Sequence, residues 1–240
     1  MASRFREHAA GETRGHKALA PWLDRVPGSV LYTAGRTMVL CTAIFEEGVP
    51  PFLLGKDQGW TTAEYDLLPG STHPRHPRER VGKISGRTQE IQRLIGRAIR
   101  ASLDLKAFPG FTLKLDCDVL QADGGTRSAA VNGAWIATAL AAADALRSGL
   151  ISRPILRRQV AALSVGILGG ELYLDLNYDE DSRADVDMTV VMDTTDGIIE
   201  IQGTAEGEPF AERDLTRMLD LVRRGLASIF ELERAAAVPR

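Results

Sequence analysis

Apolar and polar residues alternate along several stretches of the chain, with the two-residue period of a half-buried strand. The clearest stretch is FTLKLDCDV, residues 111–119, in which one face is apolar and the other is charged. The positions on the expected buried face are Phe111, Leu113, Leu115, Cys117 and Val119. We therefore predict a strand here, and it leads directly toward Gly124 and Gly125.

Three longer stretches each carry two strand patterns joined by a turn signal. The turn signals are Gly35-Arg36, Gly169-Gly170 and Asp196-Gly197, within residues 28–47, 158–178 and 187–203. Glycine and Asp-Gly pairs supply the backbone conformations that tight hairpin turns require. These stretches predict three antiparallel hairpins, and a further extended segment is expected at residues 58–69.

Three other stretches follow the 3.6-residue period of a helix or carry a helix-favouring composition. In residues 87–105 and 210–237 the apolar positions form one stripe, so each helix should pack one face on a core. The stretch from Thr126 to about Leu146 is mostly alanine with a few larger apolar residues. Because these helices are interspersed with antiparallel hairpins, we expect an α+β fold with mixed β-sheets and packed helices.

Length and composition are those of an ordinary globular protein. The chain has 240 residues, of which 44% are hydrophobic and 25% charged. No serine- or proline-rich linker divides it, so we expect a single domain over residues 1–240, in which residues 1–27 form a polar N-terminal arm. The net charge of -3 and the isoelectric point of about 5.9 mean that any nucleic-acid site must be a local basic patch.

The cysteines and the apolar runs indicate where the protein resides. Cys41 and Cys117 both lie in apolar strand patterns, which favours buried, reduced thiols and a cytoplasmic protein. No apolar run approaches the roughly 20 residues that a membrane span requires. Residues 1–17 lack a hydrophobic signal core, so we expect no association with a membrane.

Residues 70–86 form the expected basic patch. This stretch has two prolines and no periodicity, and it is longer than most loops without a function. Its cationic residues are Arg75, Arg78, Arg80 and Lys83, with Glu79 as the only acid among them.

The GGTR motif is a candidate anion site at a helix start. Its two glycines allow close approach of a ligand to the backbone, and Arg127 offers a planar fork for two phosphate oxygens. A Gly-Gly turn that caps a core helix without any ligand explains the motif equally well. Arg87, however, stands at the start of the preceding helix. Cations are unfavourable in a first helical turn, so two such arginines suggest a shared oxyanion.

An acidic run lies between two of the predicted strands. Its members are Asp175, Asp179, Glu180, Asp181, Asp185 and Asp187. Such carboxylates could hold Mg²⁺ together with substrate phosphates, or one could act as a general acid. We interpret Asp179, Glu180 and Asp185 as members of a solvated loop. Asp187 differs because it opens an apolar strand.

These three features describe transfer at phosphorus on a polyanionic chain. Such chemistry depends on positioning and on neutralising charge. No Ser/His/Asp order, cysteine-histidine zinc spacing or P-loop signature is present in the sequence, which argues against hydrolase triads, zinc sites and ATP-driven motors.

The sequence resembles the RNase PH family over most of its length, from about Gly28 to the closing helix. The matching stretches include QGWTTAEYDLLP, GRTQEIQRLIGRAIRASLDL, LDCDVLQADGGTR and DLNYDEDSRADVDM. The resemblance implies the RNase PH-type fold and a homohexamer built as a trimer of dimers. It also implies a reversible 3′-to-5′ exoribonuclease, in which inorganic phosphate is the co-substrate and nucleoside diphosphates are released. The implied substrates are nucleotides after the CCA end of tRNA precursors, with rRNA as a further substrate and DNA excluded.

Position within the matched motifs assigns the site residues. The resemblance assigns phosphate binding to Arg87, Gly125, Thr126 and Arg127, and the catalytic carboxylates to Asp181 and Asp187. In this hypothesis Asp187 assists departure of the 3′ oxygen and Asp181 steadies the developing charge. Both carboxylates would also hold a Mg²⁺ ion. Arg75 and Arg78 would hold the RNA backbone.

Two departures from the family pattern bear on RNA binding rather than on the reaction. Residues 12–22, ETRGHKALAPW, replace an R-x-D-G-R type segment, and Gly70 stands where family members usually carry arginine. Two alternatives stay open at this point. One is a non-catalytic ring subunit that binds RNA or a partner enzyme, and the other is a hydrolytic nuclease that uses two metal ions.

Overall fold

Two β-sheets form the framework of the computed structural model, which describes residues 8–79 and 84–238. The first sheet has the order β1-β2-β3-β5-β4, in which β4 is parallel to β5 and the other neighbours are antiparallel. Its strands are β1 (His16–Leu19), β2 (Ser29–Ala34), β3 (Thr37–Glu47), β4 (Trp60–Leu67) and β5 (Phe111–Gln121). The predicted strand at residues 111–119 is therefore an inner strand, flanked by β3 and β4.

The second sheet is antiparallel throughout and has the order β7-β6-β8-β9. Its strands are β6 (Val160–Leu168), β7 (Glu171–Leu174), β8 (Val186–Asp193) and β9 (Ile198–Ala205). The three predicted hairpins are confirmed as β2–β3, β6–β7 and β8–β9. The third hairpin turns at Asp196, which has a positive φ of 62°.

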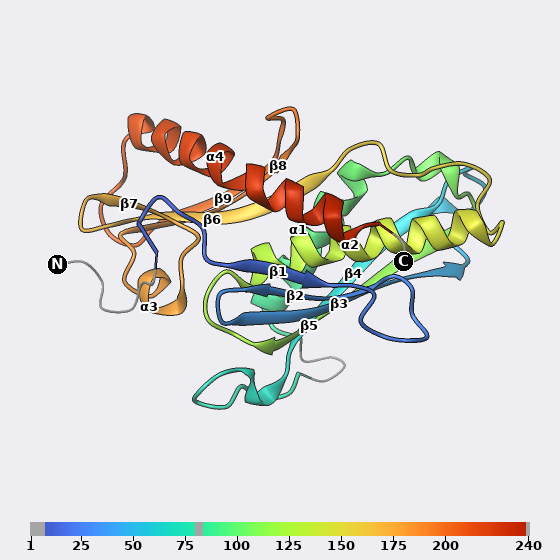
Figure 1. Ribbon diagram of the computed structural model, residues 1–240, viewed down its shortest axis with the longest axis horizontal. Coiled ribbons are helices and arrows are strands. Elements are labelled where there is room, and N and C mark those ends of the chain that lie inside the picture. Colours follow the sequence, from blue (N-terminus) through green and yellow to red (C-terminus); the bar gives the residue numbers. More distant parts are fainter. Residues whose placement is uncertain (1–7, 80–83, 239–240) are drawn as a thin grey trace.

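Helices cover the sheets in layers (Figure 1). The helices are α1 (Gly86–Ser102), α2 (Thr126–Arg147), α3 (Tyr178–Asp181) and α4 (Glu212–Ala236), with short 3-10 turns η1 (Pro51–Leu53), η2 (Pro69–Ser71) and η3 (Leu105–Ala107). α1 and α2 pack against the first sheet, and α2 also contacts β6 of the second sheet. α4 packs on the second sheet through a separate group of buried side chains.

β6 shows how the pattern of the chain produces these layers. Val160 and Ala162 belong to the core around α2, whereas Ala161, Leu163 and Val165 belong to the core beneath α4. Because successive side chains of a strand point to opposite faces, both faces of β6 are covered by helices. This explains why its sequence is an almost continuous apolar run rather than an alternating one.

α2 is buried between the two sheets, and its composition makes that placement possible. A Cβ atom at Gly133 would lie 2.6 Å from Sγ of Cys41, so the helix approaches β3 very closely. The expectation that no apolar run reaches membrane-spanning length is wrong for α2, which qualifies by length and mean hydropathy. The apolar stretch of α2 is 83% buried inside the protein, which identifies α2 as a core helix.

The structure also differs from the expected polar N-terminal arm. Part of that arm is β1, and Arg14 just before it is 5% exposed.

The predicted strand that contains Leu174 and Leu176 ends at Leu174, because Asp175 adopts a positive φ of 55° and turns the chain toward α3. Of the basic patch, Arg80 and Lys83 lie outside the described residues.

Candidate active site

The loop between β5 and α2 creates a helix start without a cap. Gly124 and Gly125 both have positive φ, of 72° and 62°. Gly125 is the N-cap residue, it provides no side-chain acceptor, and the first turn of α2 contains no acidic residue. The first N–H groups of a helix have no intrahelical acceptor and carry the positive end of the helix dipole. The start of α2 therefore has the features of an anion-binding site.

Thr126 begins α2 and is linked to the first sheet by a hydrogen bond. The hydroxyl of Tyr65 on β4 donates to Oγ1 of Thr126 at 2.8 Å. Both side chains are buried, with exposed fractions of 2% for Tyr65 and 8% for Thr126. Burial raises the pKa of Tyr65, so the phenol stays protonated.

Arg127 extends from the first turn of α2 toward α1 and β9. Its Nη2 lies 3.7 Å from Oε2 of Glu90, and its Nη1 lies 3.5 Å from Oε1 of Gln202. Both contacts are long for charge-assisted hydrogen bonds, which are typically about 2.7–2.9 Å. The guanidinium group is therefore available to a stronger anionic ligand.

Arg87 lies in the first turn of α1 and is exposed. Within residues 8–79 and 84–238 its guanidinium group forms no hydrogen bond or ion pair. Its charge, like that of Arg127, acts on Tyr65 and Asp181, where both arginines oppose the rise in pKa that burial causes. The two predicted phosphate-binding arginines thus lie near the same groups.

The predicted carboxylates come from the second half of the chain. Asp181 ends α3, and Asp187 is the second residue of β8. Asp181 is exposed, yet the surrounding protein displaces enough water from its carboxylate to raise its pKa, and repulsion from Asp187 adds to the rise. The structure therefore brings two arginines and two carboxylates, separate in the sequence, within electrostatic reach of one another.

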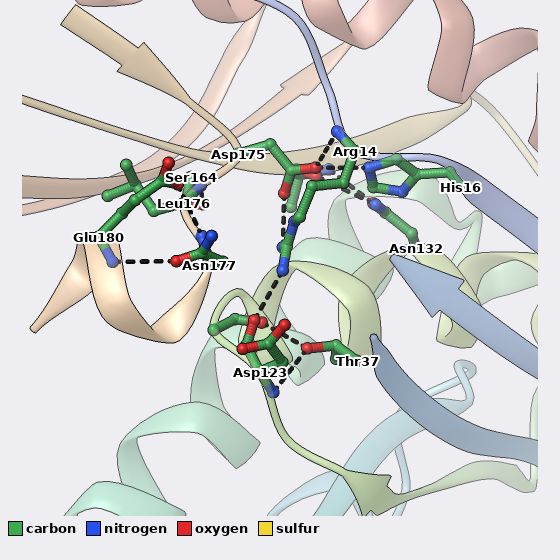
Figure 2. A network of polar contacts seen from close by, with 12 residues as sticks. Arg14, His16, Thr37, Asp123, Asn132, Ser164, Asp175, Leu176, Asn177 and Glu180 are labelled. Atoms are coloured by element: carbon green, nitrogen blue, oxygen red, sulfur yellow. Dashed lines mark hydrogen bonds and ion pairs between the residues drawn. The ribbon is translucent and has the colours of Figure 1, made fainter. Parts of the chain in front are cut away.

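A buried ion pair between Arg14 and Asp175 lies next to Asp123, in the loop that leads into α2 (Figure 2). Nη2 of Arg14 lies 2.7 Å from Oδ1 of Asp175, and the Arg14 backbone N–H donates to Oδ2 of Asp175 at 2.9 Å. Nη1 of Arg14 donates to the carbonyl of Asp123 at 2.7 Å, and Nε2 of His16 contacts Oδ2 of Asp175 at 2.9 Å. Burial alone would raise the pKa of Asp175, but the nearby Arg14 and His16 hold it below its usual value.

The glycine loop, Gly124 and Gly125 between β5 and α2, packs directly against the backbone that leads into α3. A Cβ atom at Gly124 would lie 2.5 Å from the carbonyl carbon of Asn177 and 2.6 Å from the carbonyl oxygen of Leu176. Thr37 donates from Oγ1 to the Gly124 carbonyl at 2.7 Å and accepts from the Asp123 N–H at 2.9 Å. Close backbone packing, in addition to the ion pair, therefore positions α2 relative to α3.

Sequence reasoning missed Arg14 and misjudged one member of the acidic run. Glu180 is 1% exposed, so its interpretation as a solvated loop residue is wrong. It forms a capping box with Asn177, in which Asn177 Oδ1 accepts from the Glu180 N–H at 2.9 Å. Asp185 is exposed and accepts the Gly169 N–H at 2.8 Å, in the turn of the β6–β7 hairpin.

Arg75 and Arg78 lie in the loop after β4, and both are exposed. The charge of Arg78 acts on Asp118, whose pKa is nevertheless raised by desolvation and by its neighbours Asp116 and Asp66. Arg78 thus lies near an acidic part of the first sheet.

Asp181 and Asp187 are the groups that could hold a metal ion. Among residues 8–79 and 84–238, no group of three or more His, Cys, Asp or Glu side chains is arranged as a metal site. Mg²⁺ usually takes only one or two carboxylates and completes its shell with water and substrate phosphates. The mutual repulsion of the two carboxylates would be relieved by a divalent cation, so this pair fits such an ion.

Comparisons with known proteins agree with this architecture. Residues 18–144 match domain 1 of the 3′ exoribonuclease family, RNase PH, and residues 158–225 match domain 2 of the same family. Together with the two sheets and their helices, these matches confirm the predicted α+β fold of the RNase PH type.

Solved structures with low sequence identity share the fold. Rice Rrp46 is 19% identical, with a TM-score of 0.77, over 97% of this chain and 99% of that chain. A chain of the Archaeoglobus fulgidus exosome with RNA bound to the active site is 22% identical, with a TM-score of 0.78, over 93% of this chain and 91% of that chain. A chain of an archaeal exosome core is 20% identical, with a TM-score of 0.76, over 95% and 89% of the two chains.

Proposed function

This chain belongs to the 3′ exoribonuclease (RNase PH) family, and on that basis we propose that it shortens RNA from the 3′ end by phosphorolysis. The substrate we propose is a tRNA precursor with extra nucleotides after its CCA end, with rRNA as a further substrate. We also propose that the protein works in the cytoplasm as a homohexamer, a trimer of dimers.

One observation carries the proposal of phosphorolysis. The start of α2 has neither a side-chain cap nor an acidic residue in its first turn, and Arg127 follows immediately. Arg87 adds a second cation that has no ion-pair partner within the described part of the chain. A phosphorolytic enzyme must hold inorganic phosphate beside the RNA, and an uncapped helix start with two arginines nearby supports that role.

The proposed reaction transfers the terminal nucleotide to phosphate. An oxygen of the phosphate held by Arg127, Arg87 and the start of α2 attacks the phosphorus of the last 3′,5′-phosphodiester. The bond from that phosphorus to the departing O3′ breaks, which releases a nucleoside 5′-diphosphate and leaves RNA with a new 3′ hydroxyl group. The arginines neutralise the charge of the two approaching phosphates.

The departing O3′ requires a proton. Burial and repulsion from the Asp187 carboxylate raise the pKa of Asp181, which suits the Asp181 carboxyl group to hold that proton. We therefore propose Asp181 as the proton donor, which exchanges the two roles assigned from the sequence. If the Asp181 and Asp187 carboxylates instead held a Mg²⁺ ion, both would be ionised, and the ion would neutralise phosphate charge in place of a proton from Asp181.

Exposed cations supply candidate contacts for the RNA backbone. Arg75 and Arg78 remain our proposal for this contact. A groove of about 820 Å³, lined in part by Lys17, Arg36 and Asp123, also lies beside the glycine loop. Each phosphate contact of this kind would make RNA affinity fall with increasing salt concentration.

Product analysis tests the proposal. Purified protein is incubated with a short tRNA-like 3′ tail, with and without inorganic phosphate, and the released nucleotides are identified. We expect nucleoside diphosphates only when phosphate is present, and their loss in Arg127→Ala. Arg213→Ala removes an arginine from α4 whose side chain is 85% exposed, so this control should keep full activity.

The alternatives give different products. Nucleoside monophosphates formed without phosphate would establish a hydrolytic nuclease and overturn the proposal. RNA binding without any products would establish a non-catalytic ring subunit. Sedimentation of the protein as a monomer with full activity on long RNA would overturn the hexamer.

A further inference from the structure

We propose that Tyr65 is a positioning residue for phosphate, because its hydrogen bond fixes the direction in which the Thr126 hydroxyl donates its own proton. The inference rests on the proposed function, in which Thr126 and the start of α2 hold inorganic phosphate. It adds a residue from β4, remote in the sequence from the GGTR motif, to the determinants of phosphate affinity.

The direction of the hydrogen bond follows from the chemistry of the two hydroxyl groups. A phenol is a stronger donor than an aliphatic alcohol, and its oxygen is a weaker acceptor. Tyr65 therefore donates to Thr126 Oγ1 at 2.8 Å. A threonine hydroxyl has only one proton, and the Thr126 hydroxyl makes no second hydrogen bond within residues 8–79 and 84–238. That proton is left for a ligand acceptor.

The surroundings of Tyr65 keep this direction fixed. The side chain is 2% exposed, and burial raises its pKa, which keeps the phenol protonated and donating. Arg87 and Arg127 both lie close enough to oppose that rise. The Tyr65–Thr126 hydrogen bond thus lies within electrostatic reach of both arginines.

The sheet holds the two partners in register. Tyr65 pairs with Cys117 in the parallel ladder between β4 and β5, and β5 leads through Gly124 and Gly125 into α2. The phenol consequently approaches Thr126 from a strand that cannot shift independently of the glycine loop. A side chain held on a rigid element in this way orients its partner more accurately than one on a mobile loop.

A double-mutant cycle distinguishes orientation of Thr126 from a purely structural role. The variants are Tyr65→Phe, Thr126→Val and the double variant, and the readouts are the phosphate dissociation constant by calorimetry without RNA and the KM for phosphate. We expect Tyr65→Phe to weaken phosphate binding about fivefold, the effect of one buried neutral hydrogen bond. We expect Thr126→Val to weaken it further, and the double variant to equal Thr126→Val alone.

Matched controls separate this effect from lost stability. Thr138→Val makes the same change as Thr126→Val at a buried position of the same helix. It should leave phosphate affinity unchanged, whatever it does to the unfolding midpoint. Thr126→Ser, which keeps the hydroxyl, should retain affinity within about twofold, the variation usual for a substitution that removes no specific interaction. This variant tests the hydroxyl even if Tyr65→Phe fails to fold.

Three results would overturn the inference. Tyr65→Phe could bind phosphate like the unmodified protein, or it could weaken binding equally with threonine and with valine at position 126. Thr126→Ser could lose affinity as fully as Thr126→Val. If the unmodified protein binds phosphate but forms no diphosphates, only the proposed reaction fails. If it binds no phosphate at all, both proposals fail.

Discussion

The starts of α1 and α2 both carry an arginine in the first turn, but side chains of the described residues cap only α1. At α1, Oγ of Ser85 accepts the Thr88 N–H at 3.1 Å. The carboxylate of Glu79 accepts the Ser85 N–H at 2.9 Å and the Thr88 hydroxyl at 3.0 Å. At α2 the N-cap is Gly125, without a side-chain acceptor or a nearby acid in the first turn.

This difference changes the hypothesis that the two helix starts share an anion, because the two helices would contribute different groups to its binding. The N-terminus of α1 already holds the Glu79 carboxylate, so α1 contributes the Arg87 side chain to the anion site rather than its backbone N–H groups. Within the described residues, the N-terminus of α2 has no such side-chain partner, so α2 contributes both its backbone N–H groups and Arg127. An arginine in a first helical turn is therefore informative only when the local caps are known.

The largest expected effect concerns the support beneath α2. Arg14→Ala removes the cation that pairs with buried Asp175 and that binds the Asp123 carbonyl before the glycine loop. Breaking a buried ion pair typically costs about 3–5 kcal/mol, and we expect the free energy of unfolding in urea to fall by that amount. Arg36→Ala removes an exposed arginine and should change it by less than about 0.5 kcal/mol. Equal results for the two variants would contradict a supporting role for Arg14.

The second effect concerns the glycine loop. In Gly124→Ala the new Cβ would lie within 2.7 Å of three backbone atoms of residues 176–178, at a φ of 72°. We expect a loss of about 2–4 kcal/mol, from left-handed strain and overpacking. Gly149→Ala has a similar φ of 78° but no atom within 4 Å of its new Cβ, so only the strain of about 1–2 kcal/mol applies. Chemical denaturation measures both, and a smaller loss at Gly124 would refute the close packing.

The third effect concerns the capped N-terminus of α1. Ser85→Ala removes the N-cap acceptor, and we expect a loss of about 1 kcal/mol in the free energy of unfolding. Phosphate affinity should not change, because this cap faces the protein's own N–H group. Ser228→Ala, at an exposed position of α4, is the control and should be nearly neutral. A clear loss of phosphate affinity in Ser85→Ala would show that the two helix starts are not distinct.

The smallest expected change in stability concerns Arg87. Arg87→Ala removes a cation from the positive end of a helix, so the unfolding free energy should stay constant or rise by up to about 0.5 kcal/mol. Phosphate affinity should nevertheless fall about tenfold, as expected for a lost charge-assisted hydrogen bond. Arg93→Ala removes an exposed arginine further along the same helix and should alter neither quantity. A marked loss of stability in Arg87→Ala would indicate a structural arginine instead.

Local patterns predicted the elements of this fold, and long-range contacts account for what they missed. Turn residues and periodicity identified the three hairpins and the long helices. They could not indicate that β4 lies parallel to β5, because nothing in either strand specifies its neighbour. Arg14 and Asp175 are 161 positions apart and meet only through the tertiary fold.

The candidate site shows the same division. The GGTR motif and the acidic run identified the residues that the fold brings near one another. Each is a short contiguous stretch of sequence, and each matches the pattern of the family. The cap formed by Glu79 was hidden in a basic stretch, where it read as a single compensating charge. Tyr65 sits in an ordinary strand pattern, so its contact with Thr126 left no signal in the sequence.

Because the start of α2 is uncapped, inorganic phosphate bound there would also stabilise the folded state of the protein. A molecule that binds only the folded chain stabilises it by RT ln(1 + [L]/Kd), about 2.7 kcal/mol at a hundredfold excess over Kd. With phosphate bound as proposed, the missing cap of this central helix is supplied from solution. The survival of the protein against proteolysis would then follow the phosphate supply of the cell, so that starvation for phosphate removes both the substrate and part of the enzyme's resistance to degradation.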